Sequence, residues 1–198
     1  VWTATSKAVL RAHGQVFYSP VVEAVARIPP QDLRMSAEAA KVRLNALGFH
    51  DEDAGLRHIE ALTSGTSRAV RIQTALMPAM LAWLADGPSP DHGLLAFRQV
   101  SEALGESPWY LRALRDEGAM AQRLAVVLST SRYAVDVLTR APETVQVLVD
   151  DDLTPLSRED LARQMNAVAR RHHDGEEAVG AIRAVRRREL FRILVADI

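Results

Sequence analysis

The 198-residue sequence contains no cysteine, so it can form neither a disulfide framework nor a thiolate metal site, which is consistent with a reducing compartment. No apolar run approaches the roughly 20 residues that a membrane helix needs. No secretory signal precedes the first expected helix. The net charge of -1 gives no global attraction to nucleic acid or to anionic membranes. These absences predict a cytoplasmic protein that binds neither a membrane nor nucleic acid.

Apolar residues make up 48% of the chain, and they recur at helical spacing between glycines and prolines. The clearest case is Met77, Met80, Leu81 and Leu84, which follow the i, i+3, i+4, i+7 pattern of one buried helix face. Comparable stripes are Leu56, Ile59 and Leu62; Leu94, Phe97, Ser101 and Leu104; Met120, Leu124, Val127 and Leu128; Tyr133, Val137 and Leu138; Leu161, Met165 and Val168; and Ile182, Val185, Leu190 and Leu194. Each stripe predicts one helix.

Helix starts are marked by capping residues and by prolines. Ser89-Pro90 and Ser107-Pro108 each place proline at the first helical position after a cap. Ser157, with Asp160 three residues further on, is the clearest cap in the chain. Pro78 lies inside a helical stripe, so we expect a kink or a restart there.

The best strand candidate is the valine-rich stretch from Thr144 to Val149, but Pro142 and Glu143 before it favour a helix. Because the helices are numerous and the loops short, we predict an all-α fold, a compact bundle of several short helices without a significant sheet. No fixed repeat period is evident, so a solenoid is not expected.

Asp150-Asp151-Asp152 follows the apolar run and is the most tempting site. A strand that ends in Asp-x-Asp is how nucleotidyltransferases hold two magnesium ions. Such sites have a Gly-Ser turn just upstream, whereas Ala141-Pro142-Glu143 precedes this run. A solvated loop at a helix end is therefore the favoured interpretation, and we predict neither metal ligands nor catalytic residues here.

Ser64, Gly65, Thr66 and Arg68 could form an anion site at a helix N-terminus. A plain helix break with a cap explains the same residues, and the favoured interpretation is that break, because the Gly-Lys-Ser/Thr of a P-loop is missing. If any phosphate binds this chain, we expect it at these four residues.

The histidines and arginines carry no recognisable site. His172 and His173 are neighbours, so on a helix they point about 100° apart and cannot chelate one metal ion. A basic patch on the last helix contains Arg183, Arg186, Arg187, Arg188 and Arg192. The patch lacks interleaved aromatic residues and a recognition-helix pattern, so a protein contact or simple solvation is favoured over nucleic acid.

Two stretches are specific enough to carry a family resemblance. One runs from Leu94-Leu95-Ala96-Phe97-Arg98 through Ser107-Pro108-Trp109-Tyr110-Leu111 to Leu128-Ser129-Thr130-Ser131-Arg132-Tyr133. The other is Arg186-Arg187-Arg188-Glu189-Leu190-Phe191-Arg192-Ile193 with Asp197, and Leu56 to Arg68 agrees as a third stretch. Together they resemble the glutamine synthetase (glutamate–ammonia ligase) adenylyltransferase and adenylyl-removing enzyme family, most closely its actinobacterial members.

The resemblance implies a long enzyme in which helical segments join two nucleotidyltransferase domains. One domain attaches AMP from ATP to glutamine synthetase, and the other removes the AMP by phosphorolysis. Both use Mg²⁺ held by acidic residues after a Gly-Ser turn, a signature that occurs nowhere in this chain. The resemblance also implies control by nitrogen status through glutamine and signal proteins of the PII type.

The chain is therefore expected to be a non-catalytic helical linker, with the flanking nucleotidyltransferase domains as its first partners. We expect residues 1–30 to be the tail of the first catalytic half, 31–150 the central bundle, and 151–198 the lead-in to the second catalytic domain. The two boundaries between these segments are expected at the prolines at 29 and 30 and at the loop 150–155. The alternative is a free-standing all-α regulatory module that binds a ligand or a protein.

Overall fold

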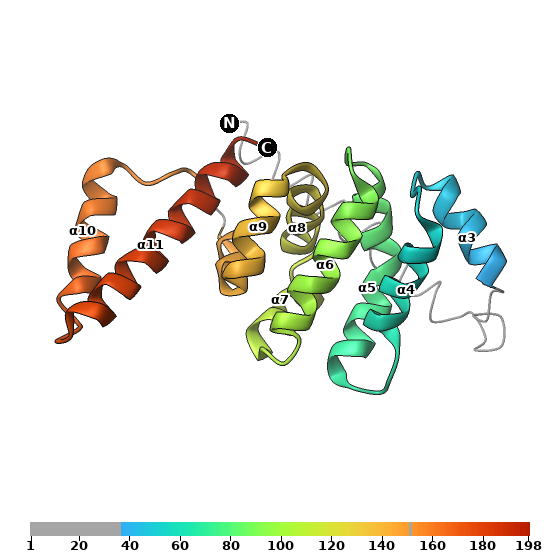
Figure 1. Cartoon of the computed structure of the whole chain (residues 1–198), viewed down its shortest axis with the longest axis horizontal. Coiled ribbons are helices and arrows are strands. Elements are labelled where there is room, and N and C mark those ends of the chain that lie inside the picture. The colour runs from blue at the N-terminus through green and yellow to red at the C-terminus, as the bar shows by residue number, and fades with distance from the viewer. Residues whose placement is uncertain (1–36, 151) are drawn as a thin grey trace. The chain divides into compact units, whose positions relative to one another are not determined.

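The structure is a computed structural model that describes residues 37–150 and 152–198. The helices are α3 (Ala37–Ala46), α4 (Glu52–Thr63), α5 (Arg68–Ala85), α6 (Pro90–Leu104), α7 (Pro108–Asp116), α8 (Gly118–Thr130), α9 (Arg132–Arg140), the 3₁₀ helix η2 (Pro142–Val149), α10 (Arg158–Ala169) and α11 (Gly175–Ala196) (Figure 1). No strand occurs in these two ranges, which confirms the predicted all-α fold. The expected tail 1–30 lies outside the described residues.

The chain divides into two compact units, with the boundary between Thr130 and Ser131. The division reflects packing alone and does not test the functional boundaries expected at residues 30 and 150. Within the described part of the chain, no helix has both the length and the apolar character needed to cross a membrane.

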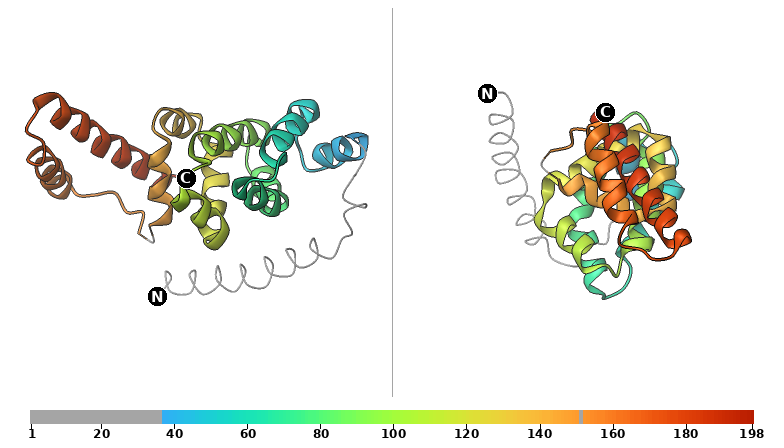
Figure 2. Two further views of the ribbon diagram at one scale, coloured as in Figure 1. Left: turned by 90° about the horizontal axis from the view of Figure 1, so that it is seen from below. Right: turned by 90° about the vertical axis from the view of Figure 1, so that its left-hand side faces the viewer.

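Unit 1, in its described part, consists of α3 to α8 packed around one apolar core. Figure 2 shows these helices from two further directions. The predicted stripe on α6 is buried in full, and so is the stripe on α8. On α5, Met77, Met80 and Leu84 are buried and Leu81 is half-buried, so the stripe was predicted correctly apart from its edge.

Helix α5 runs through Pro78 without a break, so of the two expected outcomes, a kink or a restart, the restart was wrong. Proline removes the hydrogen bond that its own N–H would donate to Thr74, four residues earlier. Both residues are exposed, so water can reach the Thr74 carbonyl in place of that N–H. The buried apolar face on the other side of α5 then holds the helix together across the proline.

Polar side chains fix the start of α5 and one turn of unit 1. Ser67 caps α5 by accepting from the Val70 N–H at 3.1 Å. Asp91, in the first turn of α6, accepts from the backbone N–H groups of His50 (3.0 Å) and Asp51 (3.1 Å), which lie in the turn between α3 and α4. The turn is therefore held by a helix some 40 residues further along the chain.

Three small residues, Gly87, Gly93 and Ser129, allow a close approach of helices in unit 1. A Cβ atom added to Gly93 would lie 2.7 Å from Leu84 Cδ2 and 3.2 Å from Ser129 Cα, and one added to Gly87 would overlap the Ser129 side chain. The hydroxyl of Ser129 is turned back to its own helix, where it donates to the Ala125 carbonyl at 2.8 Å. Glycine at 87 and 93 thus lets α8 approach the end of α5 and the start of α6.

Unit 2 consists of α9, η2, α10 and α11. Its core lies where α9 and η2 pack against the C-terminal half of α11, and it contains Leu138, Val145, Leu148 and Phe191, none of which is exposed. The stretch from Thr144 to Val149 is helical, as predicted, in the tighter 3₁₀ form.

Helices α10 and α11 form an antiparallel hairpin (Figures 1 and 2). Ser157 caps α10 as predicted, and its hydroxyl oxygen accepts from the Asp160 N–H at 3.1 Å. The predicted apolar face of Leu161, Met165 and Val168 is only half-buried, and α10 has no buried residue. This helix is therefore covered on one side only by the described residues.

Candidate functional sites: an arginine cluster and a surface cavity

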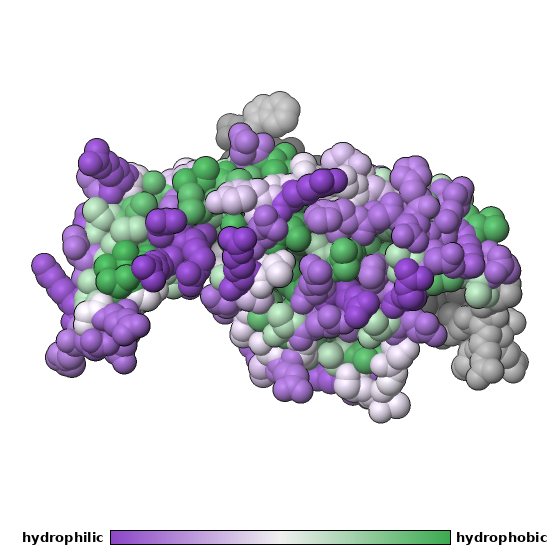
Figure 3. Space-filling view, viewed as in Figure 1, coloured by the Kyte–Doolittle hydropathy of each residue, from purple (hydrophilic) through white to green (hydrophobic). Residues whose placement is uncertain are grey.

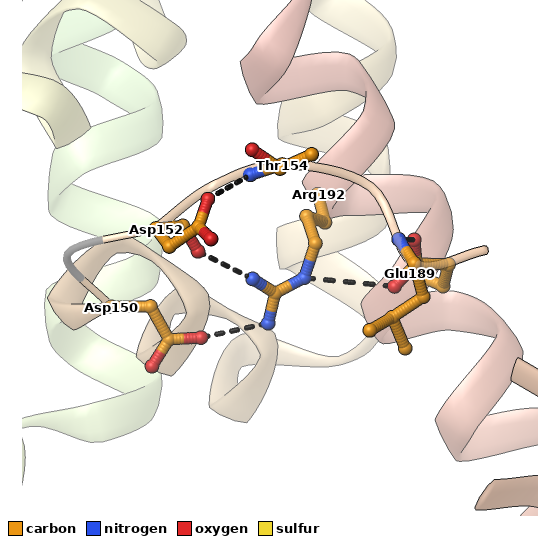
Figure 4. Close-up of polar contacts among 6 residues, drawn as sticks. Asp150, Asp152, Thr154, Glu189 and Arg192 are labelled. Carbon is orange, nitrogen blue, oxygen red and sulfur yellow. Dashed lines mark hydrogen bonds and ion pairs between the residues drawn. The ribbon is translucent and has the colours of Figure 1, made fainter. Parts of the chain in front are cut away.

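Asp150 and Asp152, the two described members of the acidic run, lie beside Arg192 of α11, which is 42 and 40 residues further along the chain (Figure 4). Arg192 Nη2 donates to Asp150 Oδ2 at 2.7 Å, and Nη1 donates to the Asp152 carbonyl at 2.8 Å. The Asp152 side chain accepts from the Thr154 N–H at 2.9 Å and so shapes its own loop. The carboxylate of Asp150 is thus occupied by a guanidinium.

Glu189 completes this cluster from one turn earlier on α11. Its Oε1 accepts from the Leu156 N–H at 2.6 Å, and its Oε2 lies 3.6 Å from Arg192 Nε. Glu189 is buried, and the Arg192 side chain is only 14% exposed. A buried carboxylate needs a cation and a donor to offset its lost hydration, and this one has both. The cluster therefore fastens the loop between η2 and α10 to α11.

The geometry of this cluster suits a structural clamp better than a metal centre. The carboxylates converge on a guanidinium, so a cation would have to displace Arg192. Within residues 37–150 and 152–198, no three His, Asp or Glu side chains are grouped so that they could hold a metal ion.

A cavity of about 420 Å³ opens on unit 1 where the end of α4 and the start of α5 face the end of α6 and the start of α7. Its walls include Ser67, Arg68 and Gln73 on one side and Glu102 and Glu106 on the other. Of the four residues expected to bind an anion, only Arg68 lines this cavity. Ser64, Gly65 and Thr66 lie in the exposed turn before α5, with Gly65 at a φ of +111° that favours glycine.

The charges on this cavity are of both signs. The charge of Arg68 helps to lower the pKa of Asp116, after the larger effect of Arg115, whereas Glu102 Oε1 accepts from Arg98 Nε at 2.6 Å. Arg98 Nη1 in turn lies 3.2 Å from His58 Nδ1. Burial, followed by the charge of Arg98, lowers the pKa of His58, so the neutral imidazole accepts this hydrogen bond. A simple phosphate site would not include two carboxylates.

Of the aromatic pair at the start of α7, Tyr110 belongs to the core and Trp109 is half-buried. Trp109 and Tyr110 meet edge to face, with ring centroids 5.8 Å apart. Tyr110 is fully buried, and its hydroxyl lies 3.0 Å from Ser101 Oγ. Burial raises the pKa of Tyr110 well above its usual range, so the phenol stays neutral and holds α7 against α6.

The histidine pair and the basic patch lie on the surface. His172 and His173 are both exposed, and His172 Nδ1 is 3.3 Å from Glu177 Oε2. Arg192 is separated from the rest of the patch by its place in the buried cluster, whereas Arg183, Arg186, Arg187 and Arg188 are exposed. The role of Glu189 was not predicted from the sequence, because a glutamate among arginines is typical of a solvent-exposed helix face.

The sequence of this chain is similar to those of one class of enzymes, the adenylyltransferases that act on glutamate–ammonia ligase. Residues 121–198 match the family model described as glutamate-ammonia ligase adenylyltransferase. The chain is 98% identical over all of its 198 residues to a bifunctional glutamine synthetase adenylyltransferase/adenylyl-removing enzyme of Cutibacterium acnes, and covers 20% of that protein. A protein of the same name from Streptomyces coelicolor is 52% identical over 200 aligned residues, again over the whole chain and 20% of the relative.

The chain therefore corresponds, over its whole length, to a segment of proteins of the glutamate–ammonia ligase adenylyltransferase family, which confirms the resemblance. It spans about a fifth of the length of these curated relatives. No solved structure matches it.

Proposed function

We propose that this chain is the helical connecting segment of a bifunctional enzyme that attaches AMP to glutamine synthetase and removes it again, and that it carries no catalytic residue. The observation that carries the proposal is the 98% identity to one fifth of a relative with that name. In support, the described residues form helices and no strand, and the carboxylate of Asp150 is paired with Arg192.

The proposal includes the expected organisation of the full-length enzyme. Residues 1–30 end the first catalytic half, 31–150 form the central bundle, and 151–198 lead into the second nucleotidyltransferase domain. The full-length enzyme works in the cytoplasm, uses ATP and Mg²⁺, acts on glutamine synthetase, and responds to a PII-type signal protein.

The test is to mix the purified 198-residue chain with Mg²⁺ and either ATP plus unmodified glutamine synthetase, or inorganic phosphate plus glutamine synthetase that already carries labelled AMP, and to follow the label. We expect neither AMP transfer nor AMP removal by the chain, and both activities from the full-length protein under the same conditions. Transfer or removal of AMP by the chain alone would refute the non-catalytic assignment. Absence of both activities from the full-length protein would refute the enzyme assignment and favour a free-standing regulatory module.

The cavity at Arg68 favours a ligand-binding role within this segment. Arg68 on one wall and Glu106 on the other suit a small molecule with one negative and one positive group, while Glu102 on the same wall as Glu106 is paired with Arg98. Free glutamine has this charge pattern, and the resemblance implies that glutamine controls the family. We therefore propose that the cavity, rather than the exposed turn before it, is where this segment binds its signal.

An NMR titration of the ¹⁵N-labelled chain tests this assignment. We expect glutamine to shift the amides of Ser67 and Arg68 and those of Glu102 to Glu106. Arg68→Ala should abolish these shifts, and Arg71→Ala, which changes a neighbouring exposed arginine that does not line the cavity, should leave them intact. Shifts with inorganic phosphate but not with glutamine would instead establish the anion site of residues 64–68.

A further inference from the structure

Helix α11 carries a strip in which two exposed arginines lie between apolar residues. The strip consists of Val179, Arg183, Arg186, Leu190 and Ile193, which we call the α11 strip. These positions follow i, i+4, i+7, i+11 and i+14, so at about 100° per residue they fall within about 80° of the helix circumference. Val179 and Ile193 are 45% and 46% exposed, and Leu190 is half-buried.

The arginines of the strip differ from several other arginines of the chain. Arg98, Arg115, Arg163 and Arg192 each form an ion pair with a carboxylate. Arg183 and Arg186 are exposed and form no ion pair or hydrogen bond through their side chains with any described residue. The strip is therefore apolar and positively charged at once, and in Figure 3 green and purple residues adjoin over the α10–α11 hairpin at the left.

Such a pattern fits a partner surface that is apolar with an acidic rim. Arginine stems can cover apolar surface while their guanidinium groups reach carboxylates at its edge. Helix α10 also indicates that this hairpin packs against a further surface. A 12-residue helix with no buried residue has little to stabilise it on its own.

The size and charge of the strip select its occupant. A second copy of the chain would have to place the same patch against itself, because a two-fold interface is isologous, and the arginines would then repel each other. A separate protein would have to bury about 800 Å² on each side, for which a strip with two exposed apolar side chains is small. A surface tethered in the same polypeptide needs far less, because tethering raises its effective concentration to about the millimolar range.

We propose that the α11 strip is an intramolecular docking surface for an apolar, acidic-rimmed surface in the remaining four-fifths of the full-length polypeptide. The proposal rests on the assignment of the chain to a longer enzyme, which its 20% coverage of a 98% identical relative supports. Docking there would fix the direction in which α11 leaves the bundle, and so position whatever α11 is joined to.

Hydroxyl-radical footprinting of the full-length protein and of the 198-residue chain tests the proposal. If the strip docks, the labelling of Val179 and Ile193 should fall about fourfold in the full-length protein, since their exposure would drop from nearly half to about a tenth. The double variant Arg183→Glu/Arg186→Glu of the full-length protein should return most of that labelling. Arg188→Glu, which reverses one charge on the opposite side of α11, should not.

Equal labelling of the strip in the chain and in the full-length protein would refute the proposal, and that comparison needs no variant to fold. Protection that appears in the isolated chain as its concentration rises would identify a second copy as the occupant. Protection that needs added glutamine synthetase would identify a separate partner. AMP transfer by the same full-length samples is measured in parallel, so an active enzyme with an unprotected strip would overturn the docking proposal alone.

Discussion

Helices α6 and α10 both carry an apolar stripe at helical spacing, yet only α6 buries it. Leu94 and Phe97 of α6 are inaccessible to solvent, whereas Leu161, Met165 and Val168 of α10 are half-buried. The α6 stripe meets α4, α5 and α8, while the α10 stripe meets α11. An apolar stripe thus identifies the face that a helix will bury, but the partner that buries it need not lie in the same segment.

The largest expected effect sharpens this comparison between two apolar stripes. Phe97→Ala should lower the free energy of unfolding by about 3–5 kcal/mol, because it leaves a cavity in a closed core. Met165→Ala in α10 should cost less than about 1.5 kcal/mol, because the side chain is already half in water. Urea denaturation of both variants checks the difference, and equal losses would mean that α10 is as firmly packed as α6.

The sequence predicts several buried stripes and caps correctly, because both depend on residues close together in the chain. Tyr133 of the predicted α9 stripe is nevertheless exposed, and Ser89 and Ser107 form no side-chain capping hydrogen bond. Met77 and Met80 are one turn apart, and Ser157 caps a helix that begins at the next residue. The arginine cluster could not be predicted in this way, since Arg192 and Asp150 are 42 residues apart and no local rule pairs them. Phe191 was missed because α11 buries different faces in its two halves, while a single stripe assumes one.

The second comparison is between the exposed and the buried charges of α11. Glu189→Ala removes the acceptor of the Leu156 N–H and a carboxylate beside Arg192, and it should cost about 1–3 kcal/mol of stability. Glu189→Gln keeps an acceptor for Leu156 and should lose less. Glu176→Gln, on the exposed first turn of the same helix, should change stability by less than about 0.5 kcal/mol. Thermal unfolding of the three variants gives the order of their stability losses. A Glu189→Ala variant as stable as the unchanged protein would show that the cluster does not hold the loop.

A pair of glycine substitutions should change stability in opposite directions in the two units. Gly93→Ala places a Cβ atom against Leu84 and the backbone of Ser129, and it should cost about 1–2 kcal/mol because of overpacking. Gly180→Ala, inside α11 with no atom within 4 Å of the new Cβ, should stabilise by about 0.5–1 kcal/mol. Melting temperatures of the two variants check the signs. A higher melting temperature for Gly93→Ala would mean that α8 can move away from α5 and α6 at little cost in free energy.

The smallest expected effect is on the pH dependence of unit 1. The pKa of His58 is lowered in the folded chain, so the unfolded chain binds a proton first as the pH falls. The stability that neutral His58 contributes is complete above the unfolded pKa of about 6.5, and it is lost as the pH falls from there toward the folded pKa. His58→Gln should therefore unfold with a shallower pH dependence between pH 7 and pH 5 than the unchanged protein. If stability depended on pH equally steeply in both proteins, His58 would not contribute to the pH dependence.

The contact of Gly87 and Gly93 with Ser129 also limits how this segment can vary in evolution. Two of the three positions already hold the smallest residue that proteins possess, so neither can shrink to compensate for a larger neighbour. All further tolerance must then come from position 129, where only alanine, glycine or serine would fit without separating α8 from α5 and α6. A bulkier residue at that position in a relative would therefore signal that the whole bundle had been rearranged around it.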